Sequence, residues 1–147
     1  MGNLDLARRL IDDVRAAGVR EFCVCAGSRN APLLAVLGEA VYSFVDERSA
    51  AFFALGRVKL HGDPVAVVTT SGTAVAEMLP AAIEAYYSGI PLVLISADRP
   101  ARFRHTGAPQ SINQIGLFGI YAETSFETWT RTKPLHLNIE FDEPLLT

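Results

Sequence analysis

Short apolar runs alternate along this chain with longer segments in which apolar residues recur at helical spacing. The runs lie at residues 22–24, 41–45, 65–68 and 92–95, and two further strand candidates lie at 125–129 and 135–139. Strands of continuous apolar character are typical of a parallel sheet that is covered on both faces. The pattern therefore predicts an α/β fold with a doubly wound, mainly parallel sheet of five to six strands and helices on both faces.

Helices are predicted between these strands, at residues 4–17, 32–37, 49–60 and 73–87. Asn3 can cap the first helix with its side chain. Pro80 should kink the fourth, because proline lacks an N–H and its ring collides with the carbonyl four residues earlier.

The last two strand candidates do not fit this alternation. Only residues 130–134 separate them, whereas a parallel pair needs a crossover of about a dozen residues. Either these two segments pair antiparallel, or one of them is not a strand.

Composition narrows the classes of function. A chain of 147 residues, half of them hydrophobic, suits one domain with a proper core. The net charge of -3 and the lack of a Lys/Arg cluster give no electrostatic footprint for nucleic acid or anionic membrane. The N-terminus lacks the basic start and the continuous apolar core of a signal peptide. No apolar run approaches the roughly 20 residues of a membrane span. We therefore expect a soluble, cytoplasmic protein with no membrane span, whose partners are small molecules or proteins.

The cysteines and histidines form no metal-binding pattern. Cys23 and Cys25 stand in an apolar run and are expected as buried thiols, and the three histidines are scattered along the chain. Because no paired Cys or His motif accompanies them, no metal ligand is expected in this chain.

Polar side chains follow each predicted strand. They occupy residues 27–30, 46–48, 69–73 and 98–100. In an open parallel sheet, ligands bind outside the carboxyl ends of the strands, where these segments meet. Two arginines, a carboxylate pair and a hydroxyl-rich turn suit an anionic or polar ligand.

Each of these groups also has a purely structural interpretation. Asp46 and Glu47 could be an N-cap and a first-turn acid, whereas a functional role for Glu47 needs a desolvated carboxylate. The turn at residues 70–73 could be a plain helix cap or a ligand-facing turn. Arg29 and Arg99 could be solvated loop residues or bidentate carboxylate clamps.

The polar residues Gln110, Asn113 and Gln114 could belong to a functional site, or they could equally be loop and cap residues.

Several enzyme classes lack support in this sequence. No Ser-His-Asp order, Walker loop or Gly-x-Gly-x-x-Gly occurs, so acyl hydrolysis, nucleotide phosphoryl transfer and dinucleotide redox chemistry are not indicated.

Five ordered motifs together resemble one family, the 2-succinyl-5-enolpyruvyl-6-hydroxy-3-cyclohexene-1-carboxylate synthases of menaquinone biosynthesis. The resemblance covers roughly residues 3–127 and resumes near 135–145. The motifs are AGSRNAPL at 26–33, DERSA at 46–50, TSGTAVA at 70–76, SADRP at 96–100 and TGAPQSI at 106–112. The resemblance implies a thiamine diphosphate-dependent transferase that decarboxylates 2-oxoglutarate and adds the succinyl carbanion equivalent to isochorismate.

The same resemblance implies roles for individual residues. Glu47 matches the catalytic, cofactor-binding glutamate that hydrogen-bonds the pyrimidine ring and drives the cofactor toward its imino form. Thr70, Ser71 and Gly72 match the turn that lines the pyrimidine pocket. The positions that match substrate contacts are Ser28, Arg29, Arg99 and Gln110.

This chain departs from the family at three points. Ala26 replaces a usual proline, and residues 130–133 are a much shorter connection than the helix found there in the family. The Gly-Asp-Gly motif and downstream asparagine that hold Mg²⁺ and diphosphate do not occur. We therefore expect residues 1–147 to be a single pyrimidine-binding domain without the central and diphosphate-binding domains.

These absences imply a partner. A domain of this kind supplies half of a site, so we expect it to be inactive alone, to need a diphosphate-binding domain or subunit, and to form a homodimer. Two alternatives stay open. One is the pyrimidine-binding subunit of another thiamine diphosphate enzyme, of the 2-oxo acid decarboxylase or acetohydroxyacid synthase type, and the other is a non-catalytic interaction module.

Overall fold

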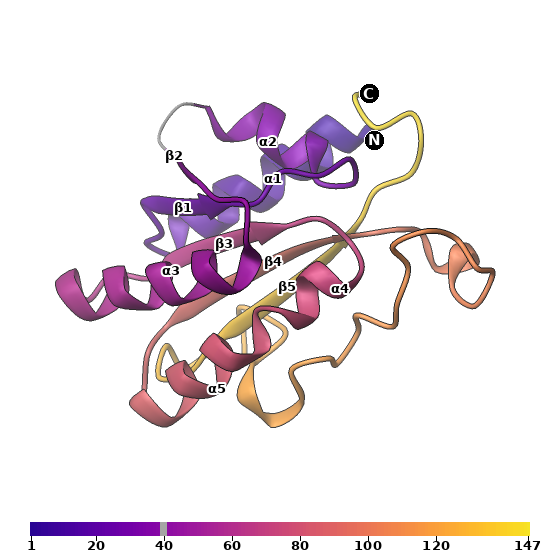
Figure 1. The fold of residues 1–147 in the computed structure, drawn as a ribbon. Coiled ribbons are helices and arrows are strands. Elements are labelled where there is room, and N and C mark those ends of the chain that lie inside the picture. Colours follow the sequence, from indigo (N-terminus) through magenta and orange to yellow (C-terminus); the bar gives the residue numbers. More distant parts are fainter. Residues whose placement is uncertain (39–40) are drawn as a thin grey trace.

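The protein folds around a five-stranded, wholly parallel sheet. The computed structural model describes residues 1–38 and 41–147, and its strand order is β2-β1-β3-β4-β5 (Figure 1). The strands are β1 (Glu21–Val24), β2 (Val41–Ser43), β3 (Val65–Thr69), β4 (Leu92–Asp98) and β5 (Leu135–Glu140). The α/β class and the parallel sheet expected from the sequence are confirmed.

Helices cover both faces of this sheet. They are α1 (Asn3–Ala16), α2 (Ala31–Leu37), α3 (Glu47–His61), α4 (Thr73–Ala76) and α5 (Leu79–Ser88), with 3₁₀ turns at Ala101–Phe103 and Gly119–Tyr121. Residues of α1 and α2 share one apolar cluster with one face of the sheet, and residues of α3 and α5 share a second cluster with the other face. Every residue of β3 and β4 is buried, which explains their continuous apolar character.

The segment 125–129 is not a strand. Ser125 accepts a hydrogen bond from the Thr128 backbone N–H at 3.4 Å, and the Trp129 indole donates to the Lys133 carbonyl at 2.7 Å, so this stretch folds into a turn. Just before it, Glu123 makes a single parallel bridge with Leu135. Of the two alternatives for the last strand candidates, the second is right, because one segment is not a strand and the sheet has five strands.

Two helix predictions need correction. The segment 73–87 is two helices, since α4 ends at Ala76 and Pro80 lies in the first turn of α5, where its missing N–H costs nothing. Asn3 does not cap α1, because Gly2 is the N-cap residue and the Asn3 amide donates to the carbonyls of Asp142 and Pro144, at 2.6 and 3.0 Å. The N-terminal helix is therefore tied to the C-terminal segment.

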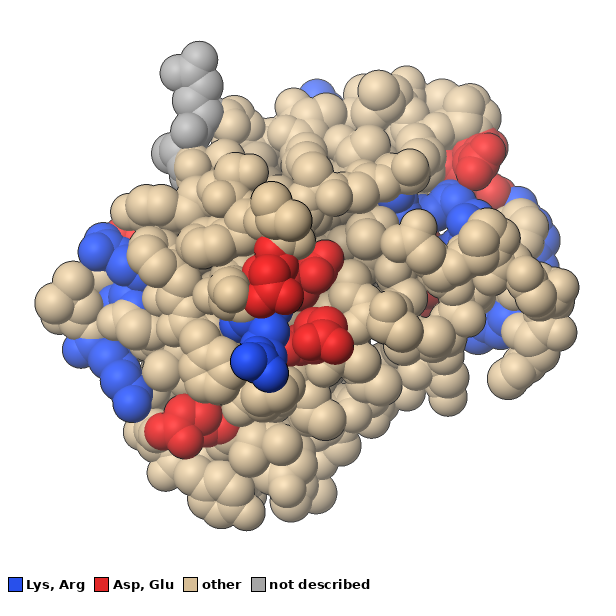
Figure 2. Space-filling view, viewed as in Figure 1, with Lys and Arg blue, Asp and Glu red and all other residues tan. Residues whose placement is uncertain are grey.

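The cysteines are buried, as expected from the sequence. Cys23 and Cys25 are free and buried, and burial is the main cause that raises the pKa of each to about 12. Charges of both signs are scattered over the face drawn in Figure 2. None of the helices in the described part of the chain combines the length and apolar character needed to cross a bilayer.

Candidate functional site at the carboxyl edge of the sheet

The loop after β1 lies against the turn after β3. Asn30, fully buried, accepts from the Gly27 N–H and donates to the Cys25 carbonyl, each at 2.9 Å, and thereby holds the loop closed. A Cβ added at Gly27 would lie 2.5 Å from the Thr70 Cβ, which is too close for any side chain. The glycine therefore lets the segment carrying Ser28 reach the turn after β3.

The turn after β3 is buried and glycine-dependent. Thr70 and Ser71 are buried, and Gly72 has a φ of +90° that side-chain-bearing residues rarely adopt. Gly72 is itself the N-cap of α4, with no side-chain cap. The turn therefore caps α4 through Gly72, and the hydroxyl groups of Thr70 and Ser71 take no part in the capping.

Gln110 and Arg99 join the same cluster. A Cβ at Gly72 would lie 3.1 Å from the Gln110 Cα, so these two backbones are in contact. The Arg99 Nε donates to the Pro109 carbonyl at 3.0 Å, which fixes the arginine beside Gln110. A continuous series of contacts therefore links the loops that follow β1, β3 and β4, as the polar segments predicted.

Glu47 is the first residue of α3, at the carboxyl end of β2. The capping role belongs to its neighbour, because Asp46 Oδ2 accepts from both the Ser49 N–H and its hydroxyl at 2.7 Å. The half-buried Glu47 carboxylate makes no hydrogen bond to any other residue that the structure describes. Burial raises the pKa of the Cys25 thiol, with further contributions from the charges of Glu47 and Asp46, so Glu47 lies near the end of β1.

Arg29 and Ser28 lie in different surroundings. Arg29 is 4% exposed, and its guanidinium donates to the Phe141 carbonyl at 2.9 Å and to Glu143 at 3.1 Å. Its Nε is buried with no partner among the described residues. Ser28 is exposed. Of the two arginines, Arg29 is therefore neither solvated nor freely presented, because it anchors the C-terminal segment.

A buried polar network underlies this cluster, and the sequence motifs did not identify most of it. Gln114 is fully buried, accepts from the Gly72 N–H at 2.9 Å, and donates to Asn138 at 2.8 Å and to the Ala97 carbonyl at 3.2 Å. Asn138 in turn donates to Asp98 Oδ2 at 2.9 Å. Gln114 thus connects the turn after β3 to the last two strands.

The network continues through Ser96 and His136. The Ser96 hydroxyl donates to Asn138 Oδ1 at 2.7 Å and lies 2.7 Å from His136 Nε2. Since that hydroxyl donates to Asn138, the imidazole donates to Ser96, which assigns the proton to Nε2. Burial lowers the pKa of His136 to about 4, so the ring is neutral near pH 7. The alternation of polar and apolar residues in β5 was the sequence signal that could have revealed these residues.

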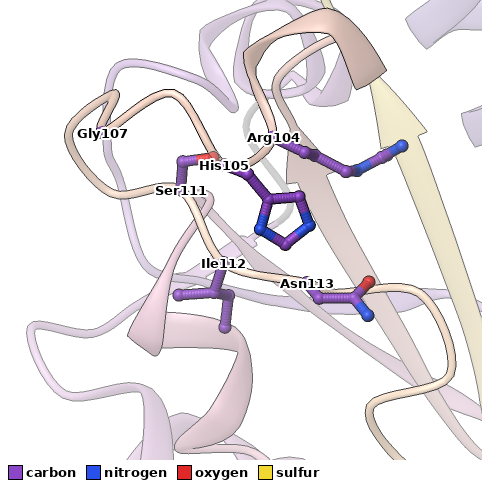
Figure 3. A pocket seen from close by; sticks show the side chains of 6 residues that line it. All are labelled: Arg104, His105, Gly107, Ser111, Ile112 and Asn113. Carbon is purple, nitrogen blue, oxygen red and sulfur yellow. The ribbon is translucent and has the colours of Figure 1, made fainter.

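A small cavity of about 110 Å³ opens in the loop between β4 and the second 3₁₀ turn (Figure 3). In this view the His105 ring lies between Ser111 and Ile112 on one side and Asn113 on the other, while the Arg104 side chain extends away from the ring. Arg104 is engaged elsewhere, with Glu140 at 2.5 Å and Asp98 at 3.4 Å. None of the predicted site residues lines this cavity.

Within residues 1–38 and 41–147, no group of three or more His, Cys, Asp or Glu side chains is arranged to hold a metal ion.

The carboxyl edge of this parallel sheet carries a glutamate without a partner among the described residues, and two turns that depend on glycine. Such an edge is typical of an α/β ligand-binding domain. Residues 4–117 match the family described as thiamine pyrophosphate enzyme, N-terminal TPP binding domain, and the chain belongs to that family.

Similar proteins make the resemblance more specific. The chain is 48% identical to a 2-succinyl-5-enolpyruvyl-6-hydroxy-3-cyclohexene-1-carboxylate synthase of Bdellovibrio bacteriovorus, with 99% of this chain and 31% of the relative covered. It is 52% identical to the protein of that name from Akkermansia muciniphila (86% and 27% covered) and 41% identical to that from Halobacterium salinarum (95% and 29%). The resemblance inferred from the five motifs is confirmed, and the chain spans about 30% of the length of these relatives.

Proposed function

We propose that this chain supplies the pyrimidine-binding half of the active site of a thiamine diphosphate-dependent synthase. The assembled enzyme would decarboxylate 2-oxoglutarate and transfer the succinyl group to isochorismate, with formation of a carbon–carbon bond, in cytoplasmic menaquinone biosynthesis. The names of the similar proteins support this choice over the decarboxylase, acetohydroxyacid synthase and interaction-module alternatives.

The main support for the proposal is the environment of the Glu47 carboxylate. Its neighbour Asp46 satisfies the helix terminus, so the Glu47 carboxylate is left without a structural partner in the described chain. A partner domain placed over this edge would desolvate the carboxylate and favour its protonated form. A protonated Glu47 could donate to a ring nitrogen, and this hydrogen bond would offset the cost of burial.

The surrounding turns pack closely together at this edge. Gly27 and Gly72 leave room for Thr70 and Gln110 beside them, so the loops after β1, β3 and β4 meet here. The Thr69 hydroxyl is buried with no partner in the described part of the chain, and Thr70 and Ser71 follow it directly. We therefore assign Glu47, Thr70, Ser71 and Gly72 to the pyrimidine ring. Bound thiamine diphosphate supplies the electron sink that a 2-oxo acid needs to lose carbon dioxide.

Four residues are assigned to the substrates. Arg99, held beside Gln110 by its bond to the Pro109 carbonyl, offers its remaining guanidinium N–H groups to a carboxylate. Ser28 is exposed on the loop that contacts Thr70. Arg29 would bind a substrate carboxylate in place of Glu143, an exposed residue whose carboxylate lies 3.1 Å from the Arg29 guanidinium. Substrate binding would then compete with the anchoring of the C-terminal segment.

An apolar surface beside Glu47 is the proposed contact for the partner domain. Val45 is fully exposed, and Tyr42, Phe52 and Phe53 are each exposed to about 40%. The rings of Tyr42 and Phe44 pack against Phe53 at centroid distances of 5.0 and 5.1 Å. Grouped exposed aromatic side chains mark interaction surfaces. The diphosphate-binding partner, which would also hold Mg²⁺, is assigned to this face.

The first test is complementation. The purified chain is mixed with the Bdellovibrio synthase from which the matching segment has been removed, together with thiamine diphosphate, Mg²⁺, 2-oxoglutarate and isochorismate. Product formation should appear only when both polypeptides are present. Glu47→Gln should lower turnover by at least about 100-fold, the usual range for a lost acid–base group. Glu77→Gln, at an exposed position on the described surface, should leave turnover unchanged.

The outcomes separate the proposals. Folded components that associate and bind cofactor but give no turnover would overturn the enzymatic assignment. Equal activity of Glu47→Gln and Glu77→Gln would remove Glu47 from the mechanism. Arg99→Ala should impair the use of isochorismate, and unchanged use of this acceptor would remove Arg99 from the substrate site. An assembly that decarboxylates a 2-oxo acid but does not use isochorismate would favour another thiamine diphosphate enzyme.

A further inference from the structure

The guanidinium of Arg29 is buried but only partly paired. Its Nη1 donates to the Phe141 carbonyl at 2.9 Å, and its Nη2 donates to Glu143 at 3.1 Å. Its Nε is buried and has no partner among the residues that the structure describes. The N–H groups of Nε and Nη2 point the same way from one edge of the guanidinium, where they form a fork that suits both oxygens of one carboxylate. Only half of this fork is in use.

Glu143 is a weakly held partner for this fork. Its side chain is 70% exposed, whereas that of Arg29 is 4% exposed, and only Oε1 contacts the guanidinium. Solvent competes for an exposed carboxylate, so such a contact adds little stability. A buried guanidinium left without any anionic partner would be costly. Glu143 therefore suits a place on Arg29 that another carboxylate can take over.

The backbone on both sides of Glu143 is fixed by contacts that do not involve its side chain. Both carboxylate oxygens of Asp142 lie 2.6 Å from Arg102 Nη2. The Asn3 amide donates to the carbonyls of Asp142 and Pro144, at 2.6 and 3.0 Å. The Glu143 carboxylate can therefore leave Arg29 by rotation of its own side chain, while the neighbouring residues stay in place.

We propose that Glu143 is an internal substitute for the substrate carboxylate, which occupies Arg29 in the empty site and is displaced when a carboxylate of isochorismate binds the fork. This inference rests on the proposed function, which assigns Arg29 to a substrate carboxylate. The guanidinium keeps an anionic partner in both states, because one carboxylate replaces another. The incoming carboxylate gains the N–H of Nε, which Glu143 does not use. The Glu143 contact is thereby autoinhibitory, since it raises the substrate concentration needed to fill the site.

The test is a titration of the isotope-labelled chain with isochorismate, followed by NMR through the Nε–H resonance of Arg29. This resonance should move on binding, because Nε gains an acceptor. Glu143→Ala should bind isochorismate about fivefold more tightly than wild type, since the internal competitor is gone. Glu143→Gln keeps the length of the side chain without its charge, and it should also bind more tightly than wild type.

Asp142→Ala is the matched control. It removes one negative charge from the adjacent residue but leaves Glu143 on Arg29. Arg102 is the main cause that lowers the pKa of Asp142, and the charge of Arg29 contributes less, so Asp142 also lies within the field of Arg29. Asp142→Ala should change the affinity for isochorismate by less than about twofold. An equal gain in Asp142→Ala and Glu143→Ala would assign the effect to net charge and overturn the inference.

The remaining outcomes separate this inference from the proposed function. Unchanged or weaker binding by folded Glu143→Ala and Glu143→Gln would overturn the inference, and so would a lack of binding by wild type and variants alike. In the complementation assay, Glu143→Ala should lower the KM for isochorismate, and an active assembly with an unchanged KM would refute the inference alone. Tighter binding by Glu143→Ala, combined with no turnover in complementation, would support the inference and refute only the enzymatic assignment.

Discussion

Gln114 is the residue whose replacement best tests how the candidate site is assembled. Its side chain is fully buried and makes three hydrogen bonds, to the Gly72 N–H, the Ala97 carbonyl and Asn138. Gln114→Met keeps the approximate volume and shape of the side chain but removes all three bonds. The variant therefore isolates hydrogen bonding from cavity formation.

The expected loss follows from what each partner retains. The Gly72 N–H, a buried donor, would be left unsatisfied, at a cost of about 1–3 kcal/mol. Asn138 Oδ1 keeps its bond from Ser96, so its loss is smaller, about 0.5–1 kcal/mol. With a similar contribution from the Ala97 carbonyl, the free energy of unfolding should fall by about 2–5 kcal/mol.

Urea unfolding monitored by circular dichroism provides the measurement. The midpoint should fall at an unchanged slope, since the same surface is exposed on unfolding. Asn113→Met, at the exposed neighbouring position, is the control and should change stability by less than about 0.5 kcal/mol. A Gln114→Met variant as stable as Asn113→Met would show that Gln114 does not hold the turn after β3 to the last strands.

Two further substitutions test the packing of the loops and the buried histidine. Gly27→Ala should destabilise the protein by about 1–3 kcal/mol in thermal unfolding, because its Cβ would overlap Thr70, whereas Gly56→Ala, with nothing within 4 Å, should be stabilising. His136 has its pKa lowered to about 4 in the folded protein, against about 6.5 when unfolded, so protonation favours unfolding in acid. Stability should therefore be full above pH 6.5 and fall by about 3 kcal/mol as the pH drops to 4, an effect that His136→Gln should remove. A Gly27→Ala variant of unchanged stability, or identical pH profiles for His136→Gln and wild type, would contradict these expectations.

Local patterns predicted the elements most reliably where burial is complete. β3 and β4 are buried throughout, so their apolar runs marked them clearly, although β4 extends beyond its run to Asp98. The segment 125–129 has an equally strand-like composition but forms a turn. Its own side chains bond to nearby backbone, and a short connection cannot carry a parallel crossover.

The site shows the same division between local and tertiary information. The polar loops at one edge followed from the rule that the carboxyl ends of parallel strands meet there, and the structure brings the loops after β1, β3 and β4 into contact. The engagement of Arg29 with Phe141 and Glu143 was not predictable, because residues more than a hundred positions apart meet there only after folding.

The amino-acid sequence by itself determined the α/β class, the order of most elements, the polar loops at one edge and the family. These features depend on short-range periodicity and on motifs, both of which are local properties of the chain. Only the tertiary structure decided which polar side chains form the network around Gln114, which groups Arg29 engages, and which strands lie at the edges of the sheet. Those features depend on contacts between distant segments, where the partner of a buried polar group is set by the packing of the whole domain.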